Sequence, residues 1–475
     1  MFVWIERGFL SLAVLGLLAA APAQAQNGLS TAAGVAAVLD ACPDPATDPV
    51  DVRTPCFAMV SFDSLVSKDE RAVIVRGTGA AVRFNFSIVD AAAVLIPNQA
   101  AYWALADNPD ITAFTPDRRV EAFGRKKSCS PWPSCKNAEE DSSESSGGGG
   151  NTQTWPSGVT RIGADATGYT GSGVGVAIAD TGLDFTHADL NVAPHPQCFD
   201  AFDGNCSDGN GHGTHVGGTV AAVDNFIDVV GVAPGATLYA VRVLNNSGSG
   251  SDSTVIAGLE WVVTEGASFD PPIQVVNMSL GRPGSLDDNP PLREAIQTIV
   301  GLGITVVVAA GNDPGSVISA QVPAVYPEVM AVASTTAEGG SNKCRSYSGV
   351  IEADTASYFT TDGVGVAISA PGAQKENISR RCSAQTVGIL SLQAGGGTTR
   401  MSGTSMASPH VAGVVALILD AACATLSPEE VRVIITGNAD LQGAAPFDSP
   451  TNGYSFDGVR EGIVDAGAAV DAAAC

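Results

Sequence analysis

Hydrophobic and polar residues follow a regular alternation of segments from about residue 155 onward. Short apolar runs alternate with stretches in which apolar residues recur every three or four positions. Runs that are apolar throughout are typical of strands buried on both faces, and the stretches between them are typical of helices. We therefore predict an α/β fold in which a parallel β-sheet is flanked by helices on both faces. The predicted strands are 175–180, 237–244, 273–280, 304–311 and 329–334, and the predicted helices are 211–223, 252–267, 290–303, 403–423 and 427–435.

Three segments precede this part of the chain. Residues 1–25 combine a short apolar run with Ala23-Gln24-Ala25, which is typical of a secretory signal peptide and too short for the alternative, a membrane anchor. Residues 26–123 are predicted to form a small α+β unit, with strands over CFAMVSF (56–62) and RAVIVRG (71–77), a helix within 97–110 and an extended stretch over 111–123. Residues 124–154 are polar and Gly/Ser-rich, which predicts a flexible linker.

Composition narrows the choice of partners and compartment. A net charge of −25 argues against nucleic acid or an anionic membrane as a partner, because both require a cationic surface. Apart from the signal, no stretch approaches about 18 apolar residues, so no membrane contact is expected after signal cleavage. Ten cysteines in an exported chain suggest disulfides, and pairing of neighbours in sequence is the simplest expectation. The expected pairs are Cys42–Cys56, Cys129–Cys135, Cys198–Cys206, Cys344–Cys382 and Cys423–Cys475.

One apolar run, GVAIAD, ends in Asp180-Thr181-Gly182, and an Asp-Thr-Gly at the end of a strand is also found in aspartic proteases. Those enzymes need two carboxylates that share one proton. The chain has no second Asp-Thr-Gly, since ADTASY at 353–358 lacks the glycine. Asp180 is therefore expected to work with residues of another kind.

Two further motifs carry a candidate base and a candidate nucleophile. His212 opens a predicted helix between two glycines, which allow close approach of the backbone. His215 could form a metal pair with it, but no third ligand stands at a metal spacing, so His215 is interpreted as a packing residue. Ser405 stands among small residues at a helix start, where a backbone N–H and the helix dipole favour an oxyanion.

Together, Asp-Thr-Gly at 180, His-Gly-Thr-His at 212 and Gly-Thr-Ser-Met-Ala-Ser-Pro-His at 403 resemble the motifs of the subtilisin-like serine proteases, in the same order. The resemblance runs from about Trp155 to the last helix, so 155–475 is predicted to be the peptidase domain. It implies that Asp180 orients His212, that His212 takes a proton from Ser405, and that Ser405 attacks a peptide carbonyl.

The resemblance also implies an oxyanion site and a peptide groove. Asn312 would supply an oxyanion-hole amide, with the backbone N–H of Ser405 as its partner. Small residues beside the primary pocket leave room for a large apolar side chain before the cut. The expected groove residues are Ser249, Gly250, Ser279, Leu280, Gly281, Ala309, Ala310 and Gly311.

A structural Ca²⁺ site is implied as well, because calcium prefers sets of hard oxygen ligands. Asp228 stands in its loop where glycine is more usual, and Gln153 could add one more oxygen. The alternative is a solvated acidic loop. The expected ligands are Asp189, Val223, Asn225, Ile227 and Val229.

A second acidic stretch, CFDAFDGNCSDGNG, carries Asp200, Asp203 and Asp208. It is either a second ion site or a surface loop closed by a disulfide.

Residues 26–123 resemble the inhibitory propeptide of this family, most closely over DNPDITAFTPDRRVEAF (107–123), which implies a processing site somewhere within 123–154. The expected protein is a secreted, self-processing serine endopeptidase that acts as a monomer on protein or peptide substrates and is inhibited by its own propeptide. The alternative is a catalytically silent, calcium-stabilised binding protein on the same fold.

Overall fold

The computed structural model describes residue 42 and residues 55–123, 153–346, 349–440 and 461–474. All of them belong to one compact unit, Val38–Cys475. The predicted signal peptide, most of the predicted linker and the pair Cys129–Cys135 lie outside the described residues.

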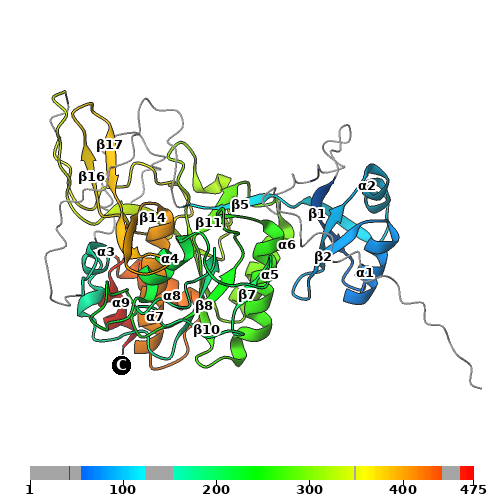
Figure 1. Ribbon diagram of the computed structural model, residues 1–475, viewed down its shortest axis with the longest axis horizontal. Coiled ribbons are helices and arrows are strands. Elements are labelled where there is room, and N and C mark those ends of the chain that lie inside the picture. Colours follow the sequence, from blue (N-terminus) through cyan, green and yellow to red (C-terminus); the bar gives the residue numbers. More distant parts are fainter. Residues whose placement is uncertain (1–41, 43–54, 124–152, 347–348, 441–460, 475) are drawn as a thin grey trace, which may run out of the picture. The chain divides into compact units, whose positions relative to one another are not determined.

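A seven-stranded parallel sheet forms the centre of the C-terminal part, residues 153–474 (Figure 1), as the apolar runs predict. Its strand order is β15-β14-β12-β10-β6-β8-β7. Two of these strands, β7 and β15, were not predicted, because β7 is only a pair of residues and β15 contains proline and glycine. The strands are β6 (Gly175–Asp180), β7 (Phe199–Asp200), β8 (Thr237–Arg242), β10 (Ile273–Met278), β12 (Thr305–Ala309), β14 (Met330–Thr336) and β15 (Ile368–Ala373).

Helices cover both faces of this sheet, and alternate residues of each strand point to opposite sides. In β6, Val176 and Ile178 pack with α4 and α7, whereas Ala177 and Ala179 pack with α5 and α6. This is the two-sided burial that the continuous apolar runs predict. The helices described in the C-terminal part are α3 (Ser157–Arg161), α4 (His212–Ala221), α5 (Asp252–Glu265), α6 (Pro290–Gly301), α7 (Thr404–Ala421), α8 (Pro428–Gly437) and α9 (Ala466–Ala473), with short 3₁₀ turns at Ala164–Ala166, Gly266–Ser268 and Ile318–Ala320.

Helix α7 is the only described helix whose length and composition would also suit a membrane span. It is 89% buried within the protein, so it is a core helix.

The N-terminal part is an α+β unit with an antiparallel sheet in the order β2-β3-β1-β4. The prediction of a strand over RAVIVRG (71–77) is wrong, because this stretch belongs to helix α1. Its β-branched residues favour a strand, but Ser67 and Glu70 form a capping box, and Arg71 and Val75 bury one helical face. The elements are β1 (Cys56–Phe62), α1 (Lys68–Gly77), β2 (Ala81–Asn85), β3 (Ala91–Ile96), α2 (Gln99–Ala106) and β4 (Ile111–Pro116).

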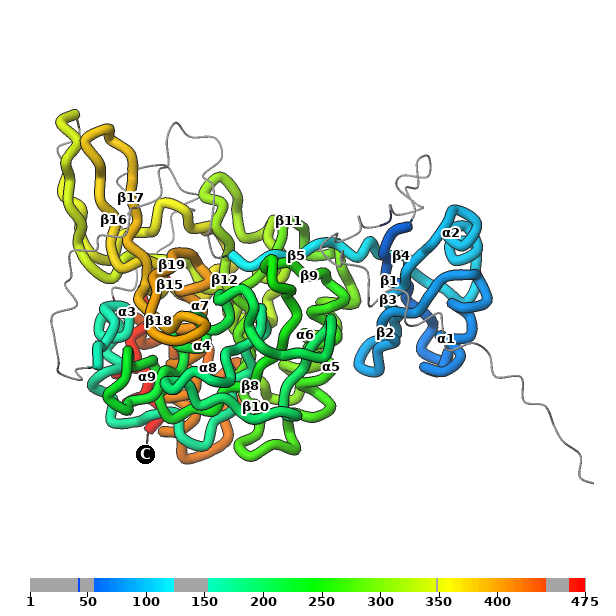
Figure 2. Tube along the Cα trace, viewed as in Figure 1, coloured from blue at the N-terminus to red at the C-terminus, as the bar shows by residue number. Residues whose placement is uncertain are grey.

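The last strand of the N-terminal part, β5 (Arg119–Ala122), pairs with strands of the C-terminal part. It runs antiparallel between β9 (Ser249–Ser251) and β11 (Leu280–Pro283), in the four-stranded order β13-β11-β5-β9 (Figure 2). Strand β13 (Gln321–Val322) completes this sheet. Two antiparallel hairpins follow β15, namely β16 (Lys375–Ile378) with β17 (Ala384–Val387) and β18 (Ile389–Leu392) with β19 (Thr398–Met401).

Sequential disulfide pairing holds where the structure describes both partners. Cys42–Cys56, Cys198–Cys206 and Cys344–Cys382 are all bonded. Cys423 is also in a disulfide, and its expected partner, Cys475, lies outside the described residues.

Candidate active site

Asp180 and His212 come together at the carboxyl edge of the main sheet. Asp180 is the last residue of β6, and His212 is the first residue of α4. The Nδ1 atom of His212 lies 2.8 and 2.9 Å from the two carboxylate oxygens of Asp180, which is fully buried. A proton on Nδ1 held in this way makes Nε2 the basic nitrogen of the ring.

Asp208, which the sequence suggested only as a possible ion ligand, holds the start of α4 in place. One oxygen accepts from the Thr181 hydroxyl at 2.8 Å and the Gly211 N–H at 2.7 Å. The other accepts from the Thr214 N–H at 2.8 Å and the Thr214 hydroxyl at 2.7 Å. Asp208 thus ties the helix that carries His212 to the loop that follows Asp180. An aspartate just before a helix start is a typical capping signal and could have suggested this role.

Ser405 is the second residue of α7 and is fully buried. Its hydroxyl donates to the backbone carbonyl of Ser279 at 3.0 Å. The hydroxyl of Ser279 in turn donates to the Ser405 carbonyl at 2.9 Å, so the end of β10 is bonded to the start of α7. Helix α7 packs against α4. His212 at the start of α4 and Ser405 at the start of α7 therefore belong to the same layer of the fold.

Asn312 bonds both to Thr404, the residue before Ser405, and to Phe123, the last described residue of the N-terminal part. Its side-chain oxygen accepts from the Thr404 N–H at 2.9 Å, and this bond fixes the orientation of the amide. Its side-chain nitrogen donates to the carbonyl of Phe123. The Phe123 N–H donates to the Ser279 carbonyl at 3.3 Å. The carbonyl group of Phe123 is thus held by the amide that the sequence predicted as an oxyanion donor.

The strand that ends at Phe123 occupies the predicted groove as a peptide ligand would. Val120 and Glu121 pair with Gly250 and Ser249, and Ala122 and Glu121 pair with Leu280 and Gly281. Val120 is completely buried in the apolar cluster beneath the groove. A Cβ atom at Gly281 would lie 2.4 Å from the ring of Phe123, so glycine leaves the space that this aromatic side chain fills.

Of the eight predicted groove residues, five contact this strand: Ser249, Gly250, Ser279, Leu280 and Gly281. The other three are buried at the end of β12, directly before Asn312, and their place beside the primary pocket stays a prediction: Ala309, Ala310 and Gly311.

Among the predicted calcium ligands, Val223 and Val229 bond to Asp189, whose side chain is fully buried, and the Val223 N–H donates to the Asp189 backbone carbonyl at 3.0 Å. Asp189 accepts from the Val229 N–H through Oδ2 at 3.1 Å, and its buried Oδ1 has no hydrogen-bond partner among the described residues. Burial, together with the charge of Asp228, raises the pKa of Asp189 to about 7. The carbonyl oxygens of Val223 and Val229 both point at the amide nitrogen of Gln153, at 2.5 and 2.7 Å.

This arrangement fits a cation with oxygen ligands. An orphaned carboxylate oxygen and two convergent carbonyls are the donor chemistry that Ca²⁺ prefers. Asn225 lies in the same loop, where its side-chain oxygen accepts from the Ile227 N–H at 2.9 Å. Asp228 has a φ of 41°, so the position where glycine is usual adopts a left-handed backbone here.

Other candidate metal groups are used in different ways. Asp200 and Asp203 both bind Arg242 at 2.8 Å, so the acidic stretch is a surface loop closed by a disulfide and held by an arginine. Cys198 and Cys206 lie close to His195, but their disulfide removes both as metal ligands.

Two residues belong to the interpretations set aside above, the histidine metal pair and the aspartic protease, and both have structural partners. The Nε2 atom of the fully buried His215 lies 3.0 Å from the Ile389 carbonyl, and burial lowers the pKa of His215 to about 3, as suits a neutral packing residue. Asp354, in the second Asp-Thr sequence, forms an ion pair with Arg161 at 2.5 Å.

A parallel sheet with a buried aspartate–histidine pair, and a serine at the N-terminus of a central helix, are the arrangement expected of a serine hydrolase. Comparisons with known proteins identify the family. Residues 171–456 match the model of the subtilase family. The chain belongs to this family and is a subtilisin-like serine endopeptidase.

Individual relatives agree with this assignment. Subtilisin DY of Bacillus licheniformis is 40% identical over 296 residues, which cover 61% of this chain and 93% of that protein. Subtilisin NAT of Bacillus subtilis subsp. natto is 40% identical over 272 residues, or 56% of this chain and 61% of that protein. M-protease of Shouchella clausii (strain KSM-K16) is 40% identical over 269 residues, or 56% of this chain and 60% of that protein. These matches favour the peptidase over the catalytically silent binding protein.

Proposed function

We propose that Asp180, His212 and Ser405 form the catalytic triad of a self-processing endopeptidase. The Ser405 hydroxyl turns from the Ser279 carbonyl toward His212 and attacks the peptide carbonyl carbon, while His212 takes its proton. The C–N bond then breaks as His212 returns the proton to the leaving amine, and water hydrolyses the acyl-enzyme by the same route. Asp180 holds the ring and stabilises its charged form.

Asn312 and the backbone N–H of Ser405 would stabilise the oxyanion that forms at the carbonyl oxygen. The hydrogen bond from the Asn312 amide to the Phe123 carbonyl supports this role. Removing such a donor lowers kcat by about 10²–10³-fold, a magnitude known from subtilisin itself.

The first substrate is the chain's own Phe123–Gly124 bond. The observation that carries this proposal is the position of Phe123, with its carbonyl on Asn312, its N–H on Ser279 and its preceding strand paired on both sides. Residues 26–123 then act as the inhibitory propeptide, because β5 continues to fill the groove after the bond is cut. Residues 124–154 are the linker, and 155–475 the peptidase domain.

The same strand supports a preference for apolar residues before the cut. Phe123 would occupy the primary pocket over Gly281, and the buried Val120 the pocket three residues earlier. Ala309, Ala310 and Gly311 would line the remainder of the primary pocket.

Calcium would stabilise the mature enzyme at Asp189. The ion would neutralise the buried carboxylate, and the loop from Val223 to Val229 would contribute carbonyl and amide oxygens. Gln153 would be a further ligand once its amide turns, because its nitrogen now donates to the Val223 and Val229 carbonyls. The N-terminal sequence supports secretion after cleavage at Ala25, and disulfides fit an oxidising compartment. The enzyme is expected to act as a monomer on protein or peptide substrates.

An active-site label tests the triad. The mature enzyme is treated with a fluorescent organophosphonate and digested, and the modified peptide is identified by mass spectrometry. Stoichiometric label on Ser405, with loss of peptidase activity, is expected for the wild type and no label for Ser405→Ala. Equal labelling of Ser405→Ala, or a fully active labelled enzyme, would contradict the proposal.

A further inference from the structure

Arg118 lies at the sixth position before the Phe123–Gly124 bond, just outside strand β5. Its backbone keeps the register of the groove, because the Asp252 N–H donates to the Arg118 carbonyl at 2.9 Å. The position of its side chain is therefore set by the same pairing that places Phe123 on Asn312. A substrate bound in this register would present its own sixth residue at the same point.

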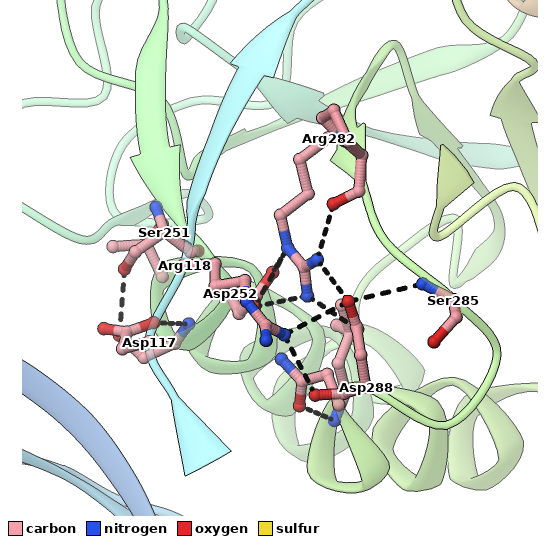
Figure 3. A network of polar contacts seen from close by, with 12 residues as sticks. Asp117, Arg118, Ser251, Asp252, Arg282, Ser285 and Asp288 are labelled. Atoms are coloured by element: carbon pink, nitrogen blue, oxygen red, sulfur yellow. Dashed lines mark hydrogen bonds and ion pairs between the residues drawn. The ribbon is translucent and has the colours of Figure 1, made fainter. Parts of the chain in front are cut away.

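The peptidase part has an uncompensated negative charge at this point (Figure 3). The Arg282 guanidinium binds Asp252 through Nε at 2.9 Å and Nη2 at 2.7 Å. It also binds Asp288 through Nη1 at 2.9 Å and Nη2 at 3.0 Å. Two carboxylates thus share one buried guanidinium. The following arginine in the sequence, Arg293 in α6, does not supply the missing charge, because it is paired with Glu328 at 3.0 Å.

Arg118 supplies the missing positive charge. Its Nη1 lies 3.1 Å from a carboxylate oxygen of Asp288 and donates to the Asp288 backbone carbonyl at 3.2 Å. The Asp288 side chain is only 15% exposed, so water screens this charge weakly, whereas the Arg118 side chain is 38% exposed and approaches from the surface. The Asp288 carboxylate therefore has two cationic partners, Arg282 from within the peptidase part and Arg118 from the strand in the groove.

We propose that Asp288, held by Arg282 and Asp252, forms a subsite that selects a cationic side chain six residues before the scissile bond. The subsite would take arginine best, since a guanidinium can reach both the carboxylate and the backbone carbonyl, and lysine next. This proposal rests on the proposed function, because it assumes that substrates bind with the same strand pairing as β5. It extends recognition beyond the residues that pair in the groove.

Arg119 provides a control within the same strand. It donates to the Ser249 hydroxyl at 2.6 Å and pairs with Glu121 at 3.0 Å. Both partners of that ion pair are more than half exposed, and Glu121 belongs to the same strand. Loss of this side chain is expected to lower binding less than loss of Arg118, because exposed ion pairs contribute little and the Ser249 hydroxyl carries no charge.

Internally quenched peptides spanning residues 117–126 test the subsite on the mature enzyme. The set has the native sequence, Arg118→Ala, Arg118→Lys, Arg118→Glu and Arg119→Ala. We expect Arg118→Ala to lower kcat/KM about tenfold, as for the loss of one charge-assisted hydrogen bond. Arg118→Glu should lower it further, Arg118→Lys should retain most of the rate, and Arg119→Ala should lower it less than Arg118→Ala does.

The Asp288→Asn enzyme, assayed with the same peptides, completes a double-mutant cycle between Asp288 and Arg118. Its kcat/KM ratio between the native and Arg118→Ala peptides should fall toward one, and a peptide that begins at Val120 normalises its overall activity. If that variant does not fold, the peptide series on the wild type still decides.

The outcomes separate the two proposals. Cleavage after Phe123 at equal rates for native, Arg118→Ala and Arg118→Glu peptides would overturn the subsite alone. No cleavage of any peptide, or cleavage at another bond, would overturn the register and with it the proposed function.

Discussion

Two arginines of the peptidase part, Arg242 and Arg282, each lie between two aspartates, and the two clusters differ in what balances the second negative charge. At Arg242, the second carboxylate belongs to Asp203, whose side chain is 63% exposed, so solvent screens it. At Arg282, both carboxylates are largely buried, and Arg118 of the proposed propeptide approaches one of them. The charges of the Arg242 cluster need no cation from outside the peptidase part. The second carboxylate of the Arg282 cluster gains a second cationic partner only when the strand that carries Arg118 is bound.

The comparison shows what turns an ion pair into a recognition site. The charges are the same, but burial decides whether the extra carboxylate needs a protein cation. The buried carboxylates of Asp189 and Glu376 extend the series, since neither has an arginine or lysine partner among the described residues. Asp189 belongs to the proposed calcium site, whereas a single oxygen of Glu376 accepts one bond, from the Tyr358 N–H at 2.8 Å.

The largest expected effect comes from removing the buried arginine. Arg282→Met leaves the fully buried Asp252 without its partner and should lower the free energy of unfolding by about 3–5 kcal/mol. Arg242→Met should cost about 1–2 kcal/mol, because Asp200 keeps three backbone N–H bonds. Denaturant unfolding of both variants in a Ser405→Ala background, which prevents self-digestion, measures the difference.

The double variant Arg282→Met with Asp252→Asn serves as the control for this first prediction. It should recover part of the loss, because the amide carries no charge. Equal destabilisation by Arg282→Met and Arg242→Met would remove the distinction between the two clusters.

Removing calcium should have the next largest effect. An ion present at 100 times its Kd stabilises the native state by about 2.7 kcal/mol. Chelation should therefore shorten the half-life of the mature enzyme at raised temperature, and Asp189→Asn should abolish the response. A wild-type half-life that is the same in EDTA and in excess calcium would count against the Asp189 site.

A pH series distinguishes Glu376 from the arginine-paired carboxylates. Burial raises the pKa of Glu376 to about 8. A carboxyl group whose pKa is higher in the folded state stabilises the fold at low pH and loses that contribution as pH rises through the folded pKa. Between pH 6 and 8 the wild type should lose about 2 kcal/mol more than Glu376→Gln.

Unfolding in the Ser405→Ala background gives this quantity, and Glu352→Gln, which neutralises an exposed carboxyl group, is the matched control. Parallel pH profiles for the wild type and Glu376→Gln would show that Glu376 titrates as it does in the unfolded chain.

The smallest expected effect concerns the backbone of the calcium loop. Asp228→Gly relieves a left-handed conformation at φ 41° but adds chain entropy, so a net gain of about 0.5 kcal/mol is expected. Asp228→Asn separates strain from charge, because it removes the carboxylate and keeps the side chain. Half-lives in saturating calcium measure both, and a shorter half-life for Asp228→Gly would show that the loop is not strained at this residue.

The sequence predicted the parts of this protein that local pattern determines. The continuous apolar runs predicted a two-sided parallel sheet, and the motifs around Asp180 and His212 predicted a pair that the structure brings to 2.8 Å. RAVIVRG was misassigned because residue preference was weighed above the capping box at Ser67. The role of Asp208 was missed because its partners include Thr181, far away in sequence.

The cluster around Arg282 could not be predicted from any local pattern. Asp252, Asp288 and Arg118 reach it from different elements, and their burial depends on the packing of α5, α6 and β11. Charge balance of this kind is a property of the folded chain. The sequence shows the residues but not which of them share one desolvated site.

The masses of the two fragments that the purified precursor produces on its own test the central claim most directly. Intact-mass and N-terminal analysis should locate the first cut between Phe123 and Gly124 in the wild type and detect only the uncut chain in Ser405→Ala. Release of the same two fragments from Ser405→Ala with no other peptidase present, or a first cut at any other bond in the wild type, would contradict the account.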